Sequence, residues 1–576
     1  MSIFTSISVL GIVAWILSFP YVALSNWHLI VLHTNDIHAR FDEVGPNGIG
    51  PCTEELKNDD DCFGGIARLI SATNAARAGE ENVILLNAGD ILQGPLWYDV
   101  YQGSLTSRFM NMMSYNVTAI GQHEFDFGVE KLTEFVQNLT FPSLACNIDG
   151  SAEPEFAAVI GCSQILTVDG ERVGVVGFTD ESYANFSQTG DLVIGSIVEY
   201  LQEEVIRLME EENVTKIIAV GHTSINNAMT IARTVRGLDL VVTGGSAVFL
   251  YTGESPDEVI EPTGEYPIVI RPDYDPDRMV LLVSVFPFGK YLGRINVTFD
   301  DITGEVLSYE GNPILLDSSV DQDEDILEEL DAYRGPVDTL AKKKVGYSLV
   351  PLDGSFEICG RQECNMGNSF ADSFFNYVLS NESFPYWGDV NFAVTNGGGF
   401  VGSFQRGDLT FGDLSYIIPF GDTLHVIEMK GEHVLEMLEF SVAGLEPGVS
   451  RYEFLQTAGL RLTYDLTKRP GNRLVSASAL CTSCEIPRFL PINVDTVYTF
   501  VTNSYIASGG EGYAVIPENL ISRIKGPSDK DVWAAYFSET SPIWTGVEGR
   551  TTFTKPAGAC AKPRPGSIAA FLCQLL

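Results

Sequence analysis

Short apolar runs alternate with helix-like segments over the first half of this chain, and this alternation most constrains the fold. The runs have the length of buried strands, and the segments between them carry the apolar spacing of helices. Strands that alternate with helices form a mainly parallel α/β sheet, and ligands bind beyond the carboxyl ends of its strands. The runs cover residues 28–32, 83–86, 117–120, 172–177, 216–220 and 238–242.

Residues that can bind divalent metals follow four of these runs within one to six positions. In chain order they are Asp36 and His38, then Asp90, His123 and His222. Carboxylate and imidazole groups presented by several strand ends can hold two divalent ions about 4 Å apart. The residues after any one run are weak evidence for a metal site, because strand ends also carry capping residues. The residues after the four runs together predict a metal centre.

One of these positions carries a second titratable group. His123 stands three residues before Asp126 in the glycine-bounded stretch 121–128. A neighbouring carboxylate can hold an imidazole cationic near neutral pH, and this cation can stabilise or protonate a leaving oxygen. The two residues are therefore a candidate acid/base pair.

The size and charge of the chain limit its class. Its 576 residues exceed what one hydrophobic core usually serves, so we expect two or more domains. The 35 basic and 76 acidic residues give a formal charge of -41, which argues against nucleic acid or an anionic membrane as a partner. We expect a soluble acidic surface and a monomer.

Several features predict export from the cell. Residues 1–25 have the apolar core and small-residue ending of a secretory signal cleaved near Ser25, although a basic residue is missing from their start. The final apolar run, 568–576, is too short to span a bilayer or to serve as a lipid-anchor signal, so we expect a freely secreted protein. Asn-x-Ser/Thr sequons fit a glycosylating pathway. They lie at Asn116, Asn138, Asn185, Asn213, Asn296 and Asn381.

All ten cysteines lie beyond residue 25 and fall in close couples. In an oxidising compartment these couples predict five local disulfides. Zinc binding by Cys481 and Cys484 is the alternative, although no second Cys or His couple lies at a useful spacing. The couples are Cys52/Cys62, Cys146/Cys162, Cys359/Cys364, Cys481/Cys484 and Cys560/Cys573.

Changes in composition divide the chain into parts. We expect an α/β domain over residues 26–316 and a second domain over 345–556, with glycine-rich turns at 396–399 and 508–512. The segment 317–344 carries acidic residues first and lysines last, an order that suits the helix dipole. It predicts a helical linker that is interrupted near Pro336. Residues 557–576 form an Ala-, Pro- and Gly-rich tail held by its own cysteine couple.

Motifs spread over both predicted domains resemble those of the secreted 5′-nucleotidases and their apyrase relatives. They are LHTNDIHAR at 32–40, GGIARL at 64–69, LNAGD at 86–90, GQHEFDFG at 121–128, ECNMGN at 363–368 and NGGG at 396–399. The resemblance covers roughly residues 26–556. It implies a two-domain α/β protein with a four-layer calcineurin-like metallophosphoesterase domain, a helical linker and a C-terminal nucleotide-binding domain that rotates to deliver substrate.

The resemblance also implies a ligand set for two metals. The first site would use Asp36, His38 and Asp90. The second would use Asp90, His222 and, in place of the family's Asn, Gln122, whose amide lies one methylene further from the backbone.

Two further ligand positions of the family have no donor side chain in this chain. They fall on Gly245 and Ala247. Loss of groups that merely support a ligand commonly costs about ten- to a hundredfold in metal affinity, and loss of a ligand should cost more. We therefore expect one weakened site for zinc, magnesium or calcium.

A nucleotide pocket is implied in the second domain. By resemblance, Phe420 and Tyr505 would sandwich the base, Glu511 would replace an Asp that holds the ribose, and Asn396 would help to orient it. Aromatic stacking of this kind tolerates different bases.

The arginines that would hold phosphate in this pocket are altered. One position is Val401, and the other is Gly360, with Arg361 one residue further on. At least half of the charge-assisted phosphate contacts are therefore expected to be missing.

An Arg-Gly-Asp tripeptide follows the altered pocket. Arg406, Gly407 and Asp408 lie in a polar stretch between apolar runs, where we expect an exposed loop tip. Several integrins bind this tripeptide when it is displayed on a turn. Average composition gives about a tenth of such a tripeptide by chance in a chain of this length, and Gly407 also suits a plain turn before a strand.

Secretion, altered metal ligands and the tripeptide together resemble the apyrase-like salivary inhibitors of platelet aggregation of biting flies. The main hypothesis is a secreted inhibitor in which Arg406 and Asp408 occupy the fibrinogen site of a platelet integrin. The alternative is an active apyrase or 5′-nucleotidase that hydrolyses extracellular ADP, ATP or AMP with a divalent metal, assisted by His123 and Asp126. A second alternative is a scavenger that binds adenine nucleotides without cleaving them.

Overall fold

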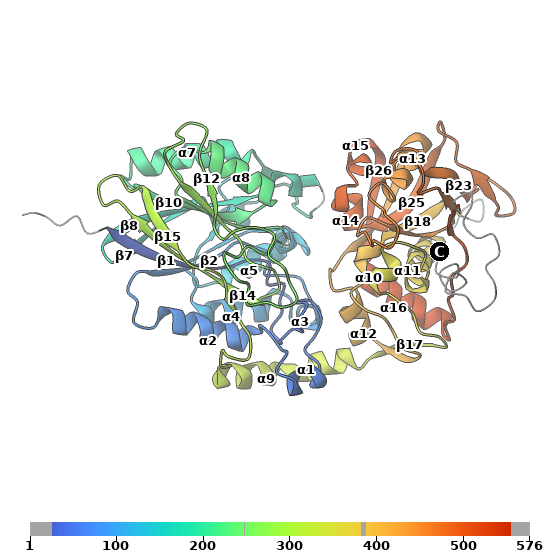
Figure 1. Ribbon diagram of the computed structural model, residues 1–576, viewed down its shortest axis with the longest axis horizontal. Coiled ribbons are helices and arrows are strands. Elements are labelled where there is room, and N and C mark those ends of the chain that lie inside the picture. Colours follow the sequence, from blue (N-terminus) through green and yellow to red (C-terminus); the bar gives the residue numbers. More distant parts are fainter. Residues whose placement is uncertain (1–25, 186, 247, 382–387, 555–576) are drawn as a thin grey trace, which may run out of the picture.

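The computed structural model describes residues 26–554 apart from 186, 247 and 382–387, and it shows two α/β domains connected by a long helix (Figure 1). The predicted signal segment at 1–25, the tail at 557–576 and the Cys560/Cys573 couple lie outside the described residues.

Two sheets form the centre of the N-terminal domain, and all six predicted runs are strands in them. Strands β1 to β4 are parallel in the first sheet, and β8, β10, β11 and β13 are parallel in the second. The first sheet has the order β15 (Val306–Glu310), β14 (Tyr291–Phe299), β1 (Trp27–Thr34), β2 (Val83–Asn87), β3 (Val117–Ala119), β4 (Ser143–Leu144) and β6 (Ile160–Gly161), with β16 (Ile314–Leu315) beside β14. The second has the order β12 (Ile268–Ile270), β13 (Val280–Val283), β11 (Leu240–Gly244), β10 (Lys216–His222), β8 (Glu171–Thr179) and β7 (Ser163–Val168).

Helices cover the outer face of each sheet, so the domain has four layers. Apolar side chains such as Val31 of the first sheet and Val220 of the second share one core between the sheets. Full burial of a side chain of this size is worth about 1.5–3 kcal/mol, so the face-to-face contact stabilises both sheets. The predicted four-layer fold is confirmed. The covering helices are α2 (Ile66–Arg77), α4 (Gly103–Met113) and α5 (Gly128–Gln137) on the first sheet, and α7 (Ile197–Glu210) and α8 (Ile225–Thr234) on the second.

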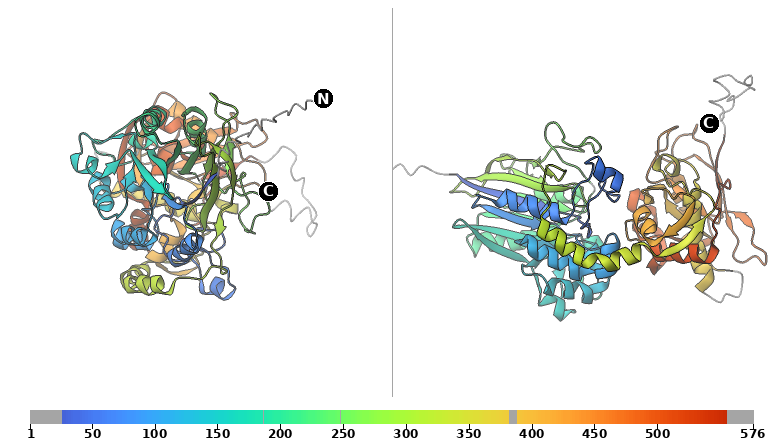
Figure 2. Two further views of the ribbon diagram at one scale, coloured as in Figure 1. Left: turned by 90° about the vertical axis from the view of Figure 1, so that its left-hand side faces the viewer. Right: turned by 90° about the horizontal axis from the view of Figure 1, so that it is seen from below.

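The linker contains α9 (Glu324–Ala341), a helix of 18 residues that lies along the N-terminal domain and reaches the C-terminal one (Figure 2). The side chain of Asp323 caps its start by accepting from the N–H groups of Asp325 and Ile326. The predicted interruption near Pro336 is wrong, because the helix continues through it. Val337, directly after the proline, is buried in the same core as the residues before it, so packing holds the helix together across the missing N–H.

The C-terminal domain has a five-stranded and a four-stranded sheet. Helix α11 (Asn365–Asn381) packs on the first of them, and α13 (Gly431–Phe440) contributes to a separate core with the second. The five-stranded order is β21 (Leu455–Ala458), β18 (Phe392–Asn396), β25 (Val497–Asn503), β20 (Thr423–Lys430) and β26 (Leu520–Ser528). The four-stranded order is β24 (Phe489–Pro491), β23 (Leu474–Leu480), β22 (Leu460–Tyr464) and β27 (Thr551–Phe553).

Short elements complete both domains. In the N-terminal domain they are α1 (Glu54–Asn58), α3 (Leu96–Tyr101), the 3-10 helix η1 (His123–Phe125), β5 (Ile148–Asp149), α6 (Pro154–Ala157), η2 (Glu181–Asn185) and β9 (Val193–Ile194). In the C-terminal domain they are β17 (Lys344–Ser348), α10 (Phe356–Cys359), η3 (Gly397–Gly399), β19 (Gly407–Thr410), α12 (Phe411–Ile417), α14 (Ser504–Ala507), η4 (Gly510–Gly512), α15 (Val515–Asn519) and α16 (Asp529–Thr540).

Four of the five predicted disulfides are present. The bond between Cys481 and Cys484 rules out the alternative of a zinc site at these two residues. The bonds are Cys52–Cys62, Cys146–Cys162, Cys359–Cys364 and Cys481–Cys484.

Among the described helices, none combines the length and the apolar character that a membrane crossing needs. Of the predicted glycosylation positions, Asn138 and Asn213 are exposed, and Asn116 and Asn296 are half-buried. The side chains of Asn185 and Asn381 are outside what the structure describes.

An ion pair connects the two domains beside the linker. Lys530 of α16 is 4% exposed and its Nζ lies 2.8 Å from a carboxylate oxygen of Asp99 on α3. Next to this pair, Leu96 of α3 packs against the core of the C-terminal domain, and the side-chain amide of Gln93 donates to the carbonyl of Pro419. Contacts of three kinds therefore hold this arrangement of the domains.

We expect Asp99→Asn to destabilise the protein more than Lys530→Met does. The first change leaves an almost buried ammonium without its counter-charge, at a cost of about 1–3 kcal/mol. The second keeps the volume of the side chain, and the Asp99 carboxylate, 28% exposed, can then be hydrated. Urea unfolding of the two variants and of the double variant measures this difference, and equal losses for the two single variants would contradict it.

Candidate metal centre

The carboxyl ends of strands from both sheets meet at one place in the N-terminal domain. Asp36 and His38 follow β1, Asp90 follows β2, and His222 is the last residue of β10. Two groups of three possible ligand atoms form there, each within 4.8 Å: Asp36, Asp90 and His222, and His38, Asp90 and His123. Asp90 belongs to both groups, so its carboxylate would be the donor that they share.

The backbone around these ligands adopts a conformation that most residues avoid. Asp36, His38 and Asp90 all have positive φ, at 50°, 52° and 50°. Asp and His tolerate this region better than most side chains, and such strain is commonly found at functional sites. Opposite them, a Cβ on Gly121 would lie 2.3 Å from an oxygen of Asp90, so this turn requires glycine.

Glu124, which the sequence analysis did not single out, holds the Asp90 loop in place. Its two buried carboxylate oxygens accept hydrogen bonds from the N–H groups of Asp90, Ile91, Leu92 and Gly121, at 2.6 to 3.1 Å. One side chain thus connects the end of β3 to the end of β2. Its place between His123 and Asp126 was the available signal, but an acidic residue in that motif also suits a plain surface turn.

Two carboxylates and one tyrosine fix the orientation of His222. Its Nε2 lies 3.2 Å from oxygens of Asp36 and Asp90, and its Nδ1 is 2.6 Å from the hydroxyl of Tyr183. Burial by itself would lower the pKa of His222, but Asp90 and Asp36 outweigh it and raise the pKa to about 9. Partners on the second ring nitrogen are typical of metal-binding histidines, because they fix the ring for coordination through the first. Tyr183, in η2, lies in no motif that sequence reasoning could use.

His38 has the opposite electrostatic character. Burial lowers its pKa to about 4, so the ring is neutral at physiological pH, the state in which histidine binds metals. Its Nδ1 is buried and has no hydrogen-bond partner within the described part of the chain. Neutral imidazole, an unpartnered ring nitrogen and a shared carboxylate together form a donor set that fits divalent metal ions.

His123 and Asp126 form a close pair beside these ligands. His123 Nδ1 lies 3.0 Å and 3.2 Å from the two oxygens of the Asp126 carboxylate. Burial opposes the charge of this imidazole, but Asp126 and Asp90 raise its pKa to about 10. The ring of His123 is 5.3 Å from that of His38, so a cationic imidazole lies next to a neutral one.

The altered ligand positions differ in what they offer the site. The backbone N–H of Gly245 donates to Asp36, at 3.2 Å from Oδ2, so this residue supports a ligand instead of acting as one. Gln122 is half-buried directly before η1. Ala247 lies outside the described residues. The metal ligands in the two groups that share Asp90 still lie close together. This favours a site that can bind metal over one that has lost this ability.

The predicted nucleotide residues lie at turns and strand ends of the C-terminal domain, and α14, which carries Tyr505, is on the side that faces the N-terminal domain (Figure 1). Tyr505 is 47% exposed, and its hydroxyl donates to Glu511 at 3.3 Å. Asn396 accepts from the side chain of Asn503 at 3.4 Å. Phe420 is half-buried, two residues before Asp422.

Asp422 connects the two predicted base-binding turns, and the sequence analysis missed it. Its carboxylate accepts from the hydroxyl of Ser504 and from the N–H of Tyr505 at 2.9 Å. Burial raises the pKa of Asp422, whereas these hydrogen bonds and the charge of His123 oppose the rise. His123 belongs to the N-terminal domain, so the two predicted sites lie within electrostatic reach of each other.

Lys525 is a basic residue of the C-terminal domain that the sequence analysis did not single out. It lies on β26 beside Arg523, opposite His425 on β20. Burial lowers its pKa, whereas the charge of Asp126 in the N-terminal domain raises it. The charge of Asp126 in one domain thus acts on a lysine of the other.

The Arg-Gly-Asp tripeptide does not lie at a loop tip. Gly407 begins β19, which pairs with β17, and Asp408 lies opposite Tyr347. The carboxylate of Asp408 is 2.6 Å from Nζ of Lys344. The buried Leu409 fixes the register of this strand, so the expected free turn is replaced by a strand edge. The side chains of Arg406 and Asp408 are nevertheless exposed.

Two sheets with helices on both outer faces, and His and Asp clusters at their carboxyl ends, are the architecture of the metallophosphoesterase class, here joined to a second α/β domain. Profile comparison agrees with this class. Residues 29–249 match the calcineurin-like phosphoesterases, and residues 344–518 match the 5′-nucleotidase C-terminal domain.

The most informative relatives cover nearly the whole chain. This chain is 38% identical to a mouse 5′-nucleotidase over 539 residues, which is 92% of each chain. It is 37% identical to a human 5′-nucleotidase over 96% of this chain and 94% of that one. A snake venom 5′-nucleotidase from Gloydius brevicauda is 33% identical over 94% and 91%. The crystal structure of a 5′-nucleotidase precursor from Thermus thermophilus has a TM-score of 0.70 at 30% identity, covering 92% of this chain and all of that one. The chain belongs to the 5′-nucleotidase family.

Gly244→Ala should weaken metal binding by at least about tenfold, because the added methyl group has no space. Its Cβ would lie 2.7 Å from His222 Cδ2 and 2.8 Å from Asp36 Oδ2, so both ligands must move. Gly335→Ala is a matched control on α9, where a Cβ meets nothing within 4 Å. Metal content after dialysis against graded chelator tests this, and equal retention by both variants would contradict the assignment.

Proposed function

We propose that the protein is an active 5′-nucleotidase that removes the phosphate of nucleoside 5′-monophosphates such as AMP. The observation that supports this most is the pair of His and Asp groups that share Asp90, one of which includes His123 with Asp126 beside it. The family relationship supports the same reaction class. The alternative of an active enzyme is thus favoured over the main hypothesis of a pure binding inhibitor.

Asp36, His38, Asp90 and His222, with Gln122 as a weaker donor, would hold divalent metal ions such as zinc, magnesium or calcium. When bound, ions of this kind neutralise phosphate charge and lower the pKa of bound water. Glu124 keeps the Asp90 loop in register with β3, and the Gly245 N–H holds Asp36. The chain itself therefore supplies a preformed frame around the phosphate.

His123 would stabilise the charge that develops on phosphate and the leaving 5′ oxygen. Asp126 accepts from Nδ1 and holds the ring cationic, so the second ring N–H can donate to an oxygen of the reacting group. Because the pair is half-buried at the strand ends, water screens this charge less than on an open surface.

The C-terminal domain would hold the nucleoside. Phe420 and Tyr505, held at adjacent turns by Asp422, offer rings for base stacking, while Glu511 and Asn396 would contact the ribose. Lys525, on which the charge of Asp126 acts, would add positive charge that attracts phosphate. We further propose that the protein is secreted and glycosylated, in keeping with its four disulfides.

His123→Asn should lower kcat for AMP by about 10²- to 10⁴-fold, because it removes the positioned proton donor. Asp126→Asn should lower it less, since the ring remains but loses its charge partner. His28→Asn, an exposed histidine on β1, is the control. Phosphate release from AMP, ADP and ATP is measured with zinc, magnesium or calcium, and after chelation.

Preferred release from AMP supports a 5′-nucleotidase, and equal release from ADP and ATP supports an apyrase. Tight nucleotide binding without phosphate release with any of the metals would rule out both enzymes. It would favour the protein that binds nucleotides without cleaving them.

A second candidate function is the integrin hypothesis, which one observation keeps open. Arg406, directly before β19, and Asp408, within it, are both exposed. Against it, the carboxylate of Asp408 would have to leave Lys344 before it could reach an integrin metal. An exposed ion pair of this kind is worth only about 0–1 kcal/mol, so it restrains Asp408 without blocking it.

If the tripeptide is functional, Asp408→Glu should reduce binding to an immobilised platelet fibrinogen-receptor integrin by at least about tenfold. Lys344→Met should leave binding equal or stronger, because it frees the carboxylate. His123→Asn separates the two functions, since it removes hydrolysis and leaves this surface unchanged. Unaltered integrin binding by Asp408→Glu would mean that the tripeptide only begins a strand and takes no part in integrin binding.

A further inference from the structure

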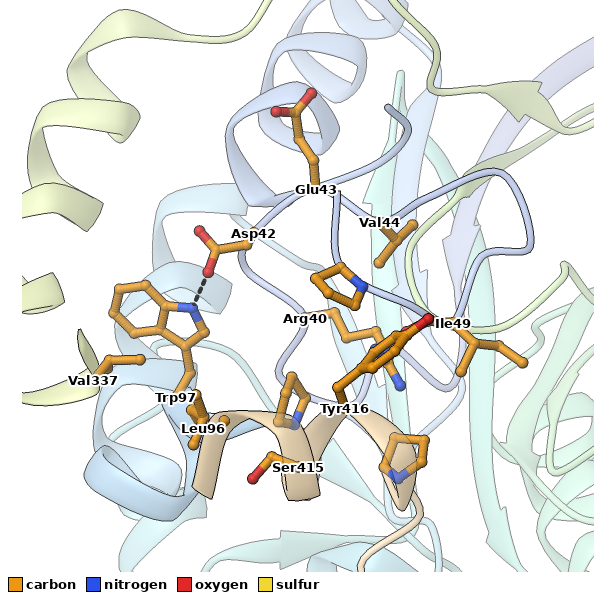
Figure 3. Close-up of a pocket in the computed structure, with 14 residues that line it drawn as sticks. Arg40, Asp42, Glu43, Val44, Ile49, Leu96, Trp97, Val337, Ser415 and Tyr416 are labelled. Atoms are coloured by element: carbon orange, nitrogen blue, oxygen red, sulfur yellow. Dashed lines mark hydrogen bonds between the residues drawn. The ribbon is translucent and has the colours of Figure 1, made fainter. Parts of the chain in front are cut away.

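A small cavity lies where the N-terminal domain, α9 and the C-terminal domain meet (Figure 3). Its volume is about 190 Å³, and its lining comes from the segment after β1, from α3, from Val337 of α9 and from α12 with Pro419. None of the proposed metal ligands lines it. The cavity is therefore separate from the candidate site.

The walls of this cavity are mainly apolar and aromatic. Trp97 and Tyr416 lie on opposite sides of it, with Ile49 and Val337 at its margins (Figure 3). The indole N–H of Trp97 donates to Asp42 at 2.7 Å, which holds that ring in place. An apolar cavity of about 150 Å³ accepts benzene, so the present volume accepts one aromatic ring with a small substituent.

The charged groups of the lining leave one positive charge uncompensated. Asp42 pairs with Arg334 at 2.6 Å, and Glu43 pairs with Arg68 at 2.6 Å. Arg40 is 6% exposed, and within the described residues no carboxylate pairs with it. It donates to the carbonyl of Ile49 and lies over the ring of Phe288, but its Nε has no partner in the described part of the chain.

A buried guanidinium without a counter-ion is costly, and a planar carboxylate is its best complement, since the two can form parallel charge-assisted hydrogen bonds. We propose that this cavity binds a single-ring aromatic carboxylate, with the carboxylate on Arg40 and the ring between Trp97 and Tyr416. The ligand would touch both domains and the linker, so its binding stabilises the present domain arrangement. This inference goes beyond the proposed function and does not depend on it.

Calorimetric titration of the full-length protein with benzoate, compared with benzamide, tests the proposal. Benzoate should bind saturably with one site per chain and raise the unfolding temperature, and benzamide, which has the same shape without the charge, should bind at least tenfold more weakly. Equal binding of the two, or no binding of benzoate, would overturn the proposal.

Two variants test the location. Arg40→Met, which removes the charge and keeps most of the volume, should lose benzoate binding by at least tenfold. Because Arg40 is buried and its loss could prevent folding, Val337→Phe provides a second test from the linker by filling the cavity, and Val337→Ala is its matched control with the cavity open. Benzoate binding should be lost in Val337→Phe and kept in Val337→Ala. Binding retained by Val337→Phe would place the ligand elsewhere.

Discussion

The carboxylate of Asp90 is the group on which the rest of the N-terminal site depends. It lies among three imidazoles from the two sheets, close to His222 and in one ligand group with His38 and His123. Its own loop has a strained backbone that is held by Glu124 and requires glycine at position 121. The strained Asp90 loop, the glycine at position 121 and the buried Glu124 are therefore explained by one requirement. The carboxylate of Asp90 must stay where the two sheets meet.

Much of the fold could be predicted from the sequence, because buried strands leave a plain signal. Each apolar run is a strand, and the residues after the runs meet because parallel strands share an edge. The groups that position the ligands could not be found in this way. Glu124 acts through backbone N–H groups, and Tyr183 and Asp422 act across long sequence separations. Such contacts depend on three-dimensional packing, which a single sequence does not encode as a local pattern.

Two sequence expectations failed because local propensity was outweighed by tertiary contacts. Pro336 lies inside a helix whose buried face continues past it, and the Arg-Gly-Asp segment is drawn into a strand by pairing with β17. At Gly245, which has no side-chain donor, the backbone N–H still donates to Asp36. A missing ligand therefore lowers the number of donors without separating those that remain.

The unbroken helix α9 gives the two domains a spacer of fixed length. Eighteen helical residues span about 27 Å, and Ile326, Leu330 and Val337 anchor nearly all of that length to the N-terminal domain. If the C-terminal domain turns relative to the N-terminal one, this anchored length stays constant, and the turn occurs about the few residues between Val337 and β17. Parts of the C-terminal domain far from these residues would then travel through a longer arc than parts beside the linker.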